Sequence, residues 1–416
     1  MLCIHGYRSI TSHNFSKYET GGRPQPSPPR VVYAGIACSA ASLALGLIIG
    51  ISALAENNGF PLNSAIAMDI FFHPDLMVFG AIGGFLLTEK LELMEKFKIG
   101  RKFRISRLTL LMLFSGVYIA TFGMFISNPA ARYLGLVLVI AASLLFFHYM
   151  TSRRNPGLAG IKNVFGAAVF ALTLSAVANL NHFITDSTEF SYLVLLFPVV
   201  YIIAERMELG FVRGMKLSMI RVLGILSWIS VIIAFSSAEL GSGFVARVLT
   251  GASIAILLSV ILTSMAYDPT FRKLRKKSRL QSFMQKGIVI SFIWLFLGIA
   301  LFMLQLIQGH GFLDPAAHSI ALGFIGTFIV SHSPIIFPLT LKKKANQDNV
   351  TYLPLIVITI ANIMRIAGDL TISFSLYSSI LSYASGYVII LAILAFAYNL
   401  KRIMPAQAPL QETATA

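Results

Sequence analysis

The first long apolar segment of the chain, residues 31–54, reads VVYAGIACSAASLALGLIIGISAL and contains no charged side chain. A helix needs about 20 predominantly apolar residues to cross the hydrocarbon core of a bilayer, because each residue adds about 1.5 Å to its length. The segment is also longer than the apolar region of a typical cleavable signal peptide. It therefore predicts a first transmembrane helix.

Segments of this kind recur along the whole chain. Together with residues 31–54 they predict an all-α fold, in which residues 31–402 form a single membrane bundle of about 12 transmembrane helices. No soluble domain of any size fits between the predicted helices. The further predicted spans are 67–88, 106–127, 131–150, 160–180, 188–204, 217–236, 245–266, 285–307, 315–340, 350–369 and 378–399.

The composition fits a membrane protein and argues against one that binds nucleic acid. Of the 416 residues, 56% are hydrophobic and 12% are charged, which is too apolar for a chain that must stay soluble. The net charge is +16, yet the basic residues stand between the apolar segments instead of forming a patch on a soluble domain. We therefore expect a lipid bilayer as the partner and no nucleic acid.

Basic residues fill alternate connections between the predicted helices. Lys and Arg accumulate in short cytoplasmic loops, so the alternation predicts a multi-pass protein of the cell membrane with both termini in the cytoplasm. Residues 1–30 are expected to form a disordered cytoplasmic tail, and residues 403–416 a second tail. Arg132, Arg247 and Arg365 depart from the rule. The residues that follow it include Lys90, Lys96, Lys98, Arg101, Arg153, Arg154, Arg206, Arg213, Arg272, Arg275, Lys342, Lys344, Lys401 and Arg402.

His73 lies in the outer part of the second predicted helix, in the segment DIFFHPDLMVFG at residues 69–80. Asp69, four residues earlier, shares its helix face and could orient the imidazole of a metal-ligating histidine. Gly80 and Gly84 lie near the same face and would leave a flat recess for a planar macrocycle. The alternative is a packing face of small residues, with Asp69 and His73 hydrogen-bonded to each other. The residues alone favour packing.

Two histidines of the tenth predicted helix face nearly the same way at different depths. His318 and His332 are about 21 Å apart along a helix axis, so they cannot bind one metal ion together. His318 is near the outer face, where we expect it to approach His73. Pro334 frees a backbone carbonyl that His332 could satisfy, so a structural role and metal ligation are both open for His332. His182 is a further candidate ligand, although its surroundings are typical of a loop histidine.

Arg365 and Asp369 are four residues apart in the eleventh predicted helix, a spacing that suits an intramembrane ion pair. We expect this pair to be buried and structural. An arginine that binds a haem propionate, or one that lines a substrate pathway, would look the same in the sequence.

Two segments resemble the NnrS family of haem- and copper-associated membrane proteins with twelve helices. One reads HSIALGFIGT at residues 318–327 and continues to HSPIIFP at 332–338, and the other is the His73 segment with its later Leu, Met, Phe and Gly. Both positions are also similar to helices two and ten of subunit I of the haem-copper oxidases. The resemblance implies a haem site with His73 and His318, copper as a further metal, and a link to nitric oxide and denitrification.

Two departures from these families reduce the expected number of metal ligands. Predicted helices six to eight contain no histidine, so an oxidase-type binuclear centre is not expected. An early His-x-His is frequent in such families, whereas Phe71 precedes His73 here.

We therefore expect a haem-binding membrane protein of the NnrS type that acts in nitric oxide or nitrogen-oxide stress handling or in electron transfer, with a redox partner. A secondary transporter is the rival interpretation, because twelve helices with both termini inside also describe many carriers. A structural or assembly protein, in which the histidines only brace helices, is the third. The histidines near one membrane face favour a cofactor over transport, and the sequence leaves open whether the protein is an enzyme.

Overall fold

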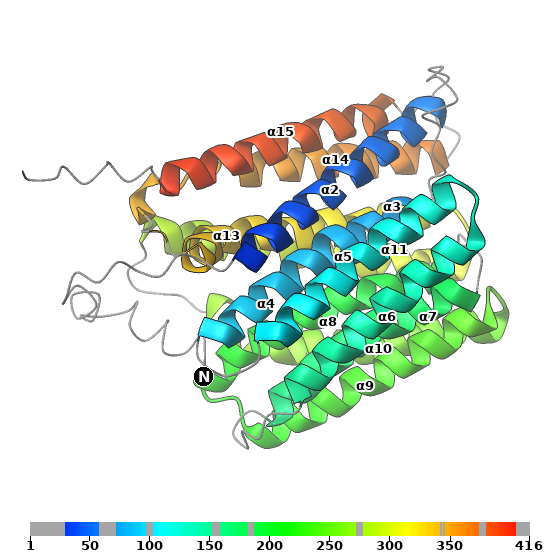
Figure 1. Cartoon of the computed structure of the whole chain (residues 1–416), viewed down its shortest axis with the longest axis horizontal. Helices are drawn as coiled ribbons and strands as arrows, with labels where there is room; N and C mark the ends of the chain where they lie inside the picture. The colour runs from blue at the N-terminus through cyan, green and yellow to red at the C-terminus, as the bar shows by residue number, and fades with distance from the viewer. Residues whose placement is uncertain are drawn as a thin grey trace, which may run out of the picture.

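The computed structural model describes residues 30–57, 72–96, 103–151, 159–181, 187–271, 278–341, 343, 346–373 and 380–404. Within these ranges the chain is helical and contains no strand. Its long helices run side by side in one bundle, and α2 (Arg30–Asn57) lies beside α15 (Ile380–Ile403), as Figure 1 shows. The prediction of an all-α helical bundle is confirmed.

The helices follow the predicted spans in order. Eleven helices of the described ranges are long and apolar enough to cross a membrane. The helical stretch from Phe72 to Lys96 matches the remaining predicted span. The other elements are α3 (Phe72–Pro74), η2 (Asp75–Gly83), α4 (Gly84–Lys96), α5 (Phe103–Phe125), α6 (Pro129–Thr151), α7 (Ala159–Asn181), α8 (Thr188–Val212), α9 (Leu217–Leu240), α10 (Phe244–Tyr267), η4 (Pro269–Phe271), α11 (Arg279–Gln308), α12 (Leu313–His318), η5 (Ser319–Gly326), α13 (Thr327–Thr340), η6 (Gln347–Asn349) and α14 (Leu353–Ser373).

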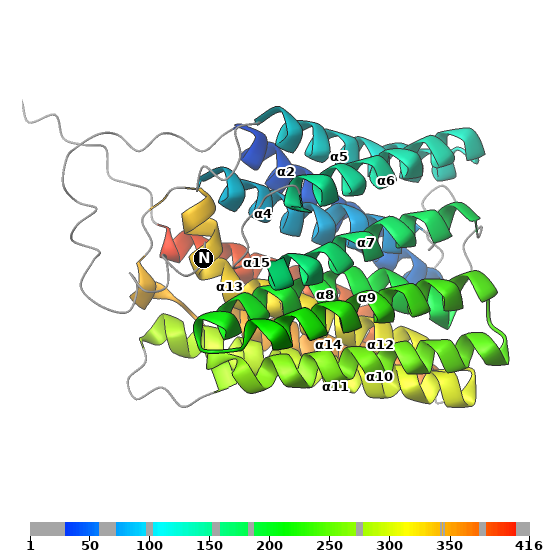
Figure 2. The ribbon, with the colours of Figure 1, turned by 90° about the horizontal axis from the view of Figure 1, so that it is seen from below.

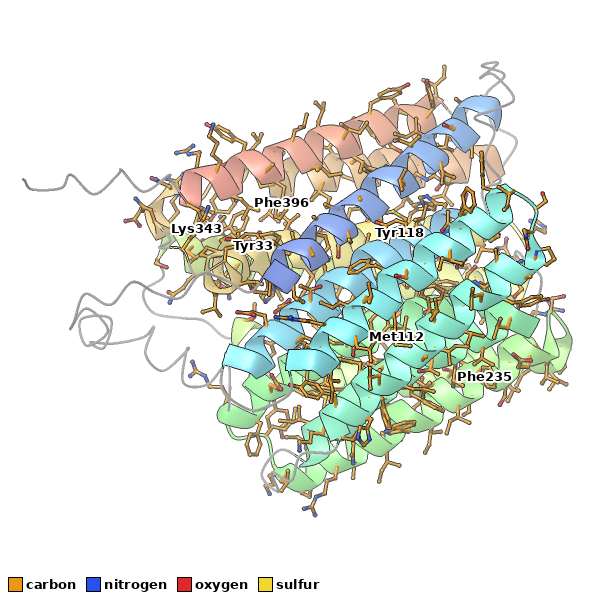
Figure 3. The ribbon with its side chains drawn as sticks, in the orientation of Figure 1. Tyr33, Met112, Tyr118, Phe235, Lys343 and Phe396 are labelled. Atoms are coloured by element: carbon orange, nitrogen blue, oxygen red, sulfur yellow. The ribbon has the colours of Figure 1, made fainter. Side chains whose placement is uncertain are left out.

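Large apolar side chains cover the outside of the bundle. Phe244 is 75% exposed, Ile307 73% and Leu111 65%. Figure 3 shows side chains projecting outward from the outer helices. A soluble protein rarely exposes so much apolar surface, whereas lipid solvates it readily. The outer surface therefore fits a lipid bilayer.

Small residues and buried hydroxyl groups hold neighbouring helices together. A Cβ atom added at Gly116 of α5 would lie 2.7 Å from the carbonyl oxygen of Gly135 in α6, so these two backbones are in direct contact. Tyr118 of α5, labelled in Figure 3, donates a hydrogen bond to the carbonyl of Cys38 in α2 at 2.9 Å. It also accepts one from Ser42 at 3.1 Å. These contacts fix α5 beside α6 and α2.

The bundle has one end that is rich in basic residues, here called the basic end. Lys343, which follows α13, lies there in Figure 3, and Lys401 and Arg402 occupy the last turn of α15. In Figure 2 the ends of α4, α13 and α15 gather at this side of the bundle. The short helix α3 lies toward the opposite end in Figure 1. The two ends therefore differ in charge, as the alternation of basic loops predicted.

Two of the helices contain a π-helical segment, and each segment closely follows a histidine. η2 begins at Asp75, after His73 and Pro74, and η5 begins at Ser319, directly after His318. A π-helical turn is wider than an α-helical one and is frequent at functional sites. Gly323 in η5 lets the wider turn approach α11, because an added Cβ atom would lie 2.7 Å from Trp294. The backbone is therefore unusual at both histidines.

Candidate metal centre

His73 of α3 and His318 of α12 face each other. Their ring centroids are 6.4 Å apart, and their planes are inclined by 34°. The side chain of His318 is 22% exposed, so the pair lies near the surface at the end of the bundle opposite the basic end. The prediction that these two histidines approach each other is confirmed.

Hydrogen bonds fix the orientation of both rings. The Nδ1 atom of His73 lies 2.8 Å from the carbonyl oxygen of Gly46 in α2, and Nδ1 of His318 lies 2.9 Å from the carbonyl oxygen of Asp314. A carbonyl oxygen only accepts, so each Nδ1 carries the proton. Each Nε2 atom then keeps its lone pair, which is the arrangement of a neutral histidine that binds a metal.

The spacing of the rings fits one metal ion between them. With metal–nitrogen bonds of about 2.0 Å and a nitrogen-to-centroid distance of about 1.1 Å, imidazoles on opposite sides of one ion have centroids about 6 Å apart. The observed 6.4 Å agrees with this value. Other tilted ring pairs of this protein have similar separations without a metal, such as Phe147 and Phe170 at 6.5 Å. The separation of His73 and His318 is therefore compatible with a shared ion and with direct packing.

A cluster of charged side chains lies beside His318. Arg365 Nε is 2.9 Å from Asp369 Oδ2, and both side chains are buried, which confirms the predicted ion pair. Arg365 Nη2 also reaches Asp314 Oδ2 at 3.3 Å. Asp369 accepts a hydrogen bond from Ser382 at 2.8 Å, and its other carboxylate oxygen is 3.9 Å from His318 Nδ1. The pair is thus part of a network that borders the histidine.

A second polar network anchors the helical stretch that carries His73, and the sequence reasoning missed it. The buried Asp75 accepts a hydrogen bond from Asn179 Nδ2 at 2.8 Å. Arg132 Nη2 donates to Asn179 Oδ1 at 2.6 Å. Arg132, which departs from the alternation of basic connections, is buried in this network. The sequence hinted at the network only in that Asp75 lies two residues after His73.

Gly80 and Gly84 serve helix packing. A Cβ atom at Gly80 would lie 2.6 Å from Ser42 Oγ of α2, and one at Gly84 would lie 2.7 Å from the Phe114 ring of α5 and closer still to Ser39. The flat recess predicted beside these glycines is therefore filled by side chains. The alternative interpretation, a packing face of small residues, describes them correctly.

His332 has a structural role in place of the metal ligation that the sequence left open. Its Nε2 atom lies 3.2 Å from Arg206 Nη1, and its Nδ1 atom lies 3.0 Å from the carbonyl oxygen of Phe328. Both ring nitrogens are thus engaged. His182, the other candidate ligand, lies outside the described residues, as does Asp69.

The described residues supply few metal ligands. Among them, no group of three or more His, Cys, Asp and Glu side chains is placed to hold a metal ion. His73 and His318 alone would offer a metal two protein ligands, so a metal held there would need further ligands from a cofactor or a coordination number of two.

Comparison with known proteins gives one result that covers nearly the whole chain. A search of curated proteins finds no match. The family described as "Domain of unknown function (DUF8744)" matches residues 30–402, which include every described helix apart from the last residue of α15. The chain therefore belongs to the DUF8744 family.

Proposed function

We propose that His73 and His318 are the axial ligands of one haem iron in a membrane protein that transfers electrons in the handling of nitric oxide or related nitrogen oxides. The observation that carries the proposal is the pair of imidazole rings 6.4 Å apart, each held through Nδ1. The nitrogen-oxide part rests on the resemblance of the His73 and His318 segments to the NnrS family.

The number of protein ligands supports haem. A porphyrin brings four nitrogen ligands, so its iron needs at most two from the protein. His73 and His318 supply two, and in the part of the chain that the structure describes no group of three or more His, Cys, Asp and Glu side chains is placed to hold a metal ion. A metal bound by side chains alone would commonly need three or four.

The surrounding residues would position the group and shield it. The carbonyls of Gly46 and Asp314 hold the two rings at fixed orientations. Arg365 is shared by the buried Asp369 and the exposed Asp314, so a haem propionate could replace the exposed carboxylate. A bound haem supplies one-electron redox chemistry. If His73 and His318 both held the iron, the group would supply electron transfer to a redox partner in preference to gas binding.

The orientation in the membrane is part of the proposal. The alternation of basic connections favours the cell membrane with both termini in the cytoplasm. The site then lies near the outer face, within reach of a redox partner outside the cytoplasm. This placement agrees with the position of His73 and His318 opposite the basic end.

A copper ion is the second candidate, and the packing at Gly80 and Gly84 favours it. Side chains of α2 and α5 fill the space that a macrocycle would need beside these glycines. Two opposed imidazoles also suit a single copper(I) ion of low coordination number, because imidazole is a good copper ligand. The same two histidines would hold either metal.

Metal analysis and a visible spectrum of the purified full-length protein test the proposal. The protein is produced in haem-supplemented cells and, separately, in copper-supplemented cells. We expect about one haem per chain and the spectrum of low-spin iron with two imidazole ligands. Copper without haem selects the second candidate. A colourless, metal-free protein from both preparations contradicts both and supports a transporter or a structural protein.

A further inference from the structure

A cavity at the basic end is bordered by α4, α8 and α13, far from His73 and His318. Its wall includes Thr88 and Glu89 of α4, Glu205 of α8, and His332 and Thr340 of α13. The volume of the cavity that water can occupy is about 40 Å³. One water needs about 10–15 Å³ by this measure, so the cavity has room for a few of them.

Two carboxylates, Glu89 and Glu205, line this cavity, and Lys90 attracts both of them. Glu89 and Glu205 lie close enough to repel each other electrostatically. In the described ranges neither carboxylate has a hydrogen bond or an ion pair. Two neighbouring carboxylates in a poorly hydrated place cannot both stay ionised at low cost.

The nearby cations are engaged by other carboxylates. Lys90 Nζ is 3.4 Å from Glu208 Oε1 and stands over the Phe165 ring at 3.8 Å. Arg206 makes two hydrogen bonds of 2.5 Å to Asp268. Lys90 attracts Glu89 and Glu205 as well as Glu208, so one ammonium group faces three carboxylates and the cavity wall keeps an excess of negative charge.

His332 does not compensate this charge either. Arg206 Nη1 donates to its Nε2 atom, and its Nδ1 proton goes to the carbonyl of Phe328, so the ring is neutral. The content of the cavity is a further source of compensation besides Lys90.

Two buried hydroxyl groups in the wall point to what the cavity contains. Thr88 is 2% exposed and Thr340 is 4% exposed, and the Oγ1 atom of each lacks a hydrogen-bond partner. A buried hydroxyl without a partner costs about 1–3 kcal/mol, so such groups usually bind an ordered water. Water held by Thr88 and Thr340 would lie in the cavity that both carboxylates line.

We propose that Glu89 and Glu205 form a proton-binding site, in which one proton is shared by the two carboxylates through water held by Thr88 and Thr340. Uptake of a proton from water at the basic end takes the pair from two negative charges to one, and no electron moves. The shared proton removes the repulsion that two ionised groups would feel. The site is separate from the metal centre and functions without it.

Infrared spectroscopy of the full-length protein in detergent tests this site, because a protonated carboxyl group has a C=O stretching band that an ionised carboxylate lacks. The wild type, Glu89→Gln, Glu205→Gln and the control Asp348→Asn are compared near neutral pH in H2O and in D2O. Asp348 is exposed and does not line the cavity, so its amide variant reports the effect of losing any carboxylate.

We expect a carboxyl band in the wild type that shifts in D2O and disappears at high pH. Each single cavity variant should lose the whole band, because the remaining carboxylate no longer has a charged neighbour and ionises. Asp348→Asn should keep it. A band that persists in both cavity variants, or a partial loss in each, overturns the shared proton. Thermal unfolding of the same samples shows whether a variant is folded, and Thr88→Val, which keeps both carboxylates, should shift the band without removing it.

Discussion

The imidazole of His73 is fixed by the backbone of Gly46, whose carbonyl oxygen lies 2.8 Å from Nδ1. One turn further along α2, Gly50 leaves space for the same ring, since an added Cβ atom would lie 3.0 Å from its Cε1 and Nδ1 atoms. Two positions of α2 therefore determine where the Nε2 atom of His73 points.

Gly50→Ala should displace the His73 ring by a few tenths of an ångström and weaken metal binding. A change beside a metal-ligating imidazole that alters its orientation typically costs about 10- to 100-fold in metal affinity. The measurement is metal content after dialysis against a chelator or apo-myoglobin. Gly251→Ala is the matched control, because an added Cβ atom there meets nothing within 4 Å. Equal metal retention in both variants would show that Gly50 does not position the ring.

Arg365→Ala and Asp369→Ala should each destabilise the protein by about 3–5 kcal/mol, because each leaves a buried charge without its partner. The double variant should be less destabilised than the sum of the two single variants. Unfolding in detergent, followed by circular dichroism, measures the three differences. Additive losses would mean that Arg365 and Asp369 do not stabilise each other.

Asp268 follows α10, outside the predicted spans, and gives a pH dependence. Burial raises the pKa of its carboxyl, but the Arg206 guanidinium and the hydrogen bonds from Arg206 and Thr270 bring the pKa below its usual value. A pKa lower in the folded state stabilises the protein above about pH 4, the ordinary value for Asp, and this stability is lost as the pH falls further. Asp268→Asn should therefore lower the unfolding temperature at pH 7, and its difference from the wild type should shrink below about pH 4. A difference independent of pH would assign the effect to packing.

Reporter tags before Met1 and after Ala416 test the orientation. The alternation of basic connections predicts that both tags are in the cytoplasm. Protease protection in spheroplasts, with a cytoplasmic and an extracytoplasmic marker as controls, reports the side of each tag. Tags on opposite sides would contradict an even number of spans.

Much of the fold was predictable because apolar length and basic loops are properties of the sequence itself. The helix ends were less so: α11 begins at Arg279, before the predicted residue 285, because Ser278 and Gln281 form a capping box around a polar first turn. The π-helical segments after His73 and His318 are as apolar as the α-helices around them. A prediction based on apolar length therefore cannot distinguish them from α-helix.

The candidate site was predictable only in part. The facing of His73 and His318 followed from their depth in two helices, and the Arg365–Asp369 pair from its spacing. Contacts between distant segments were not available from the sequence, such as the bond of His332 to Arg206 and the cavity shared by Glu89 and Glu205.

The spectrum of the two histidine variants tests the central claim most directly. The full-length wild type, His73→Ala, His318→Ala and the control His310→Ala, which changes an exposed histidine, are purified from haem-supplemented cells. Optical and electron paramagnetic resonance spectra are then recorded. If both imidazoles ligate one haem iron, each of the two variants loses the same low-spin component completely, and His310→Ala keeps it. Retention of that component in either His73→Ala or His318→Ala would contradict a centre shared by the two residues.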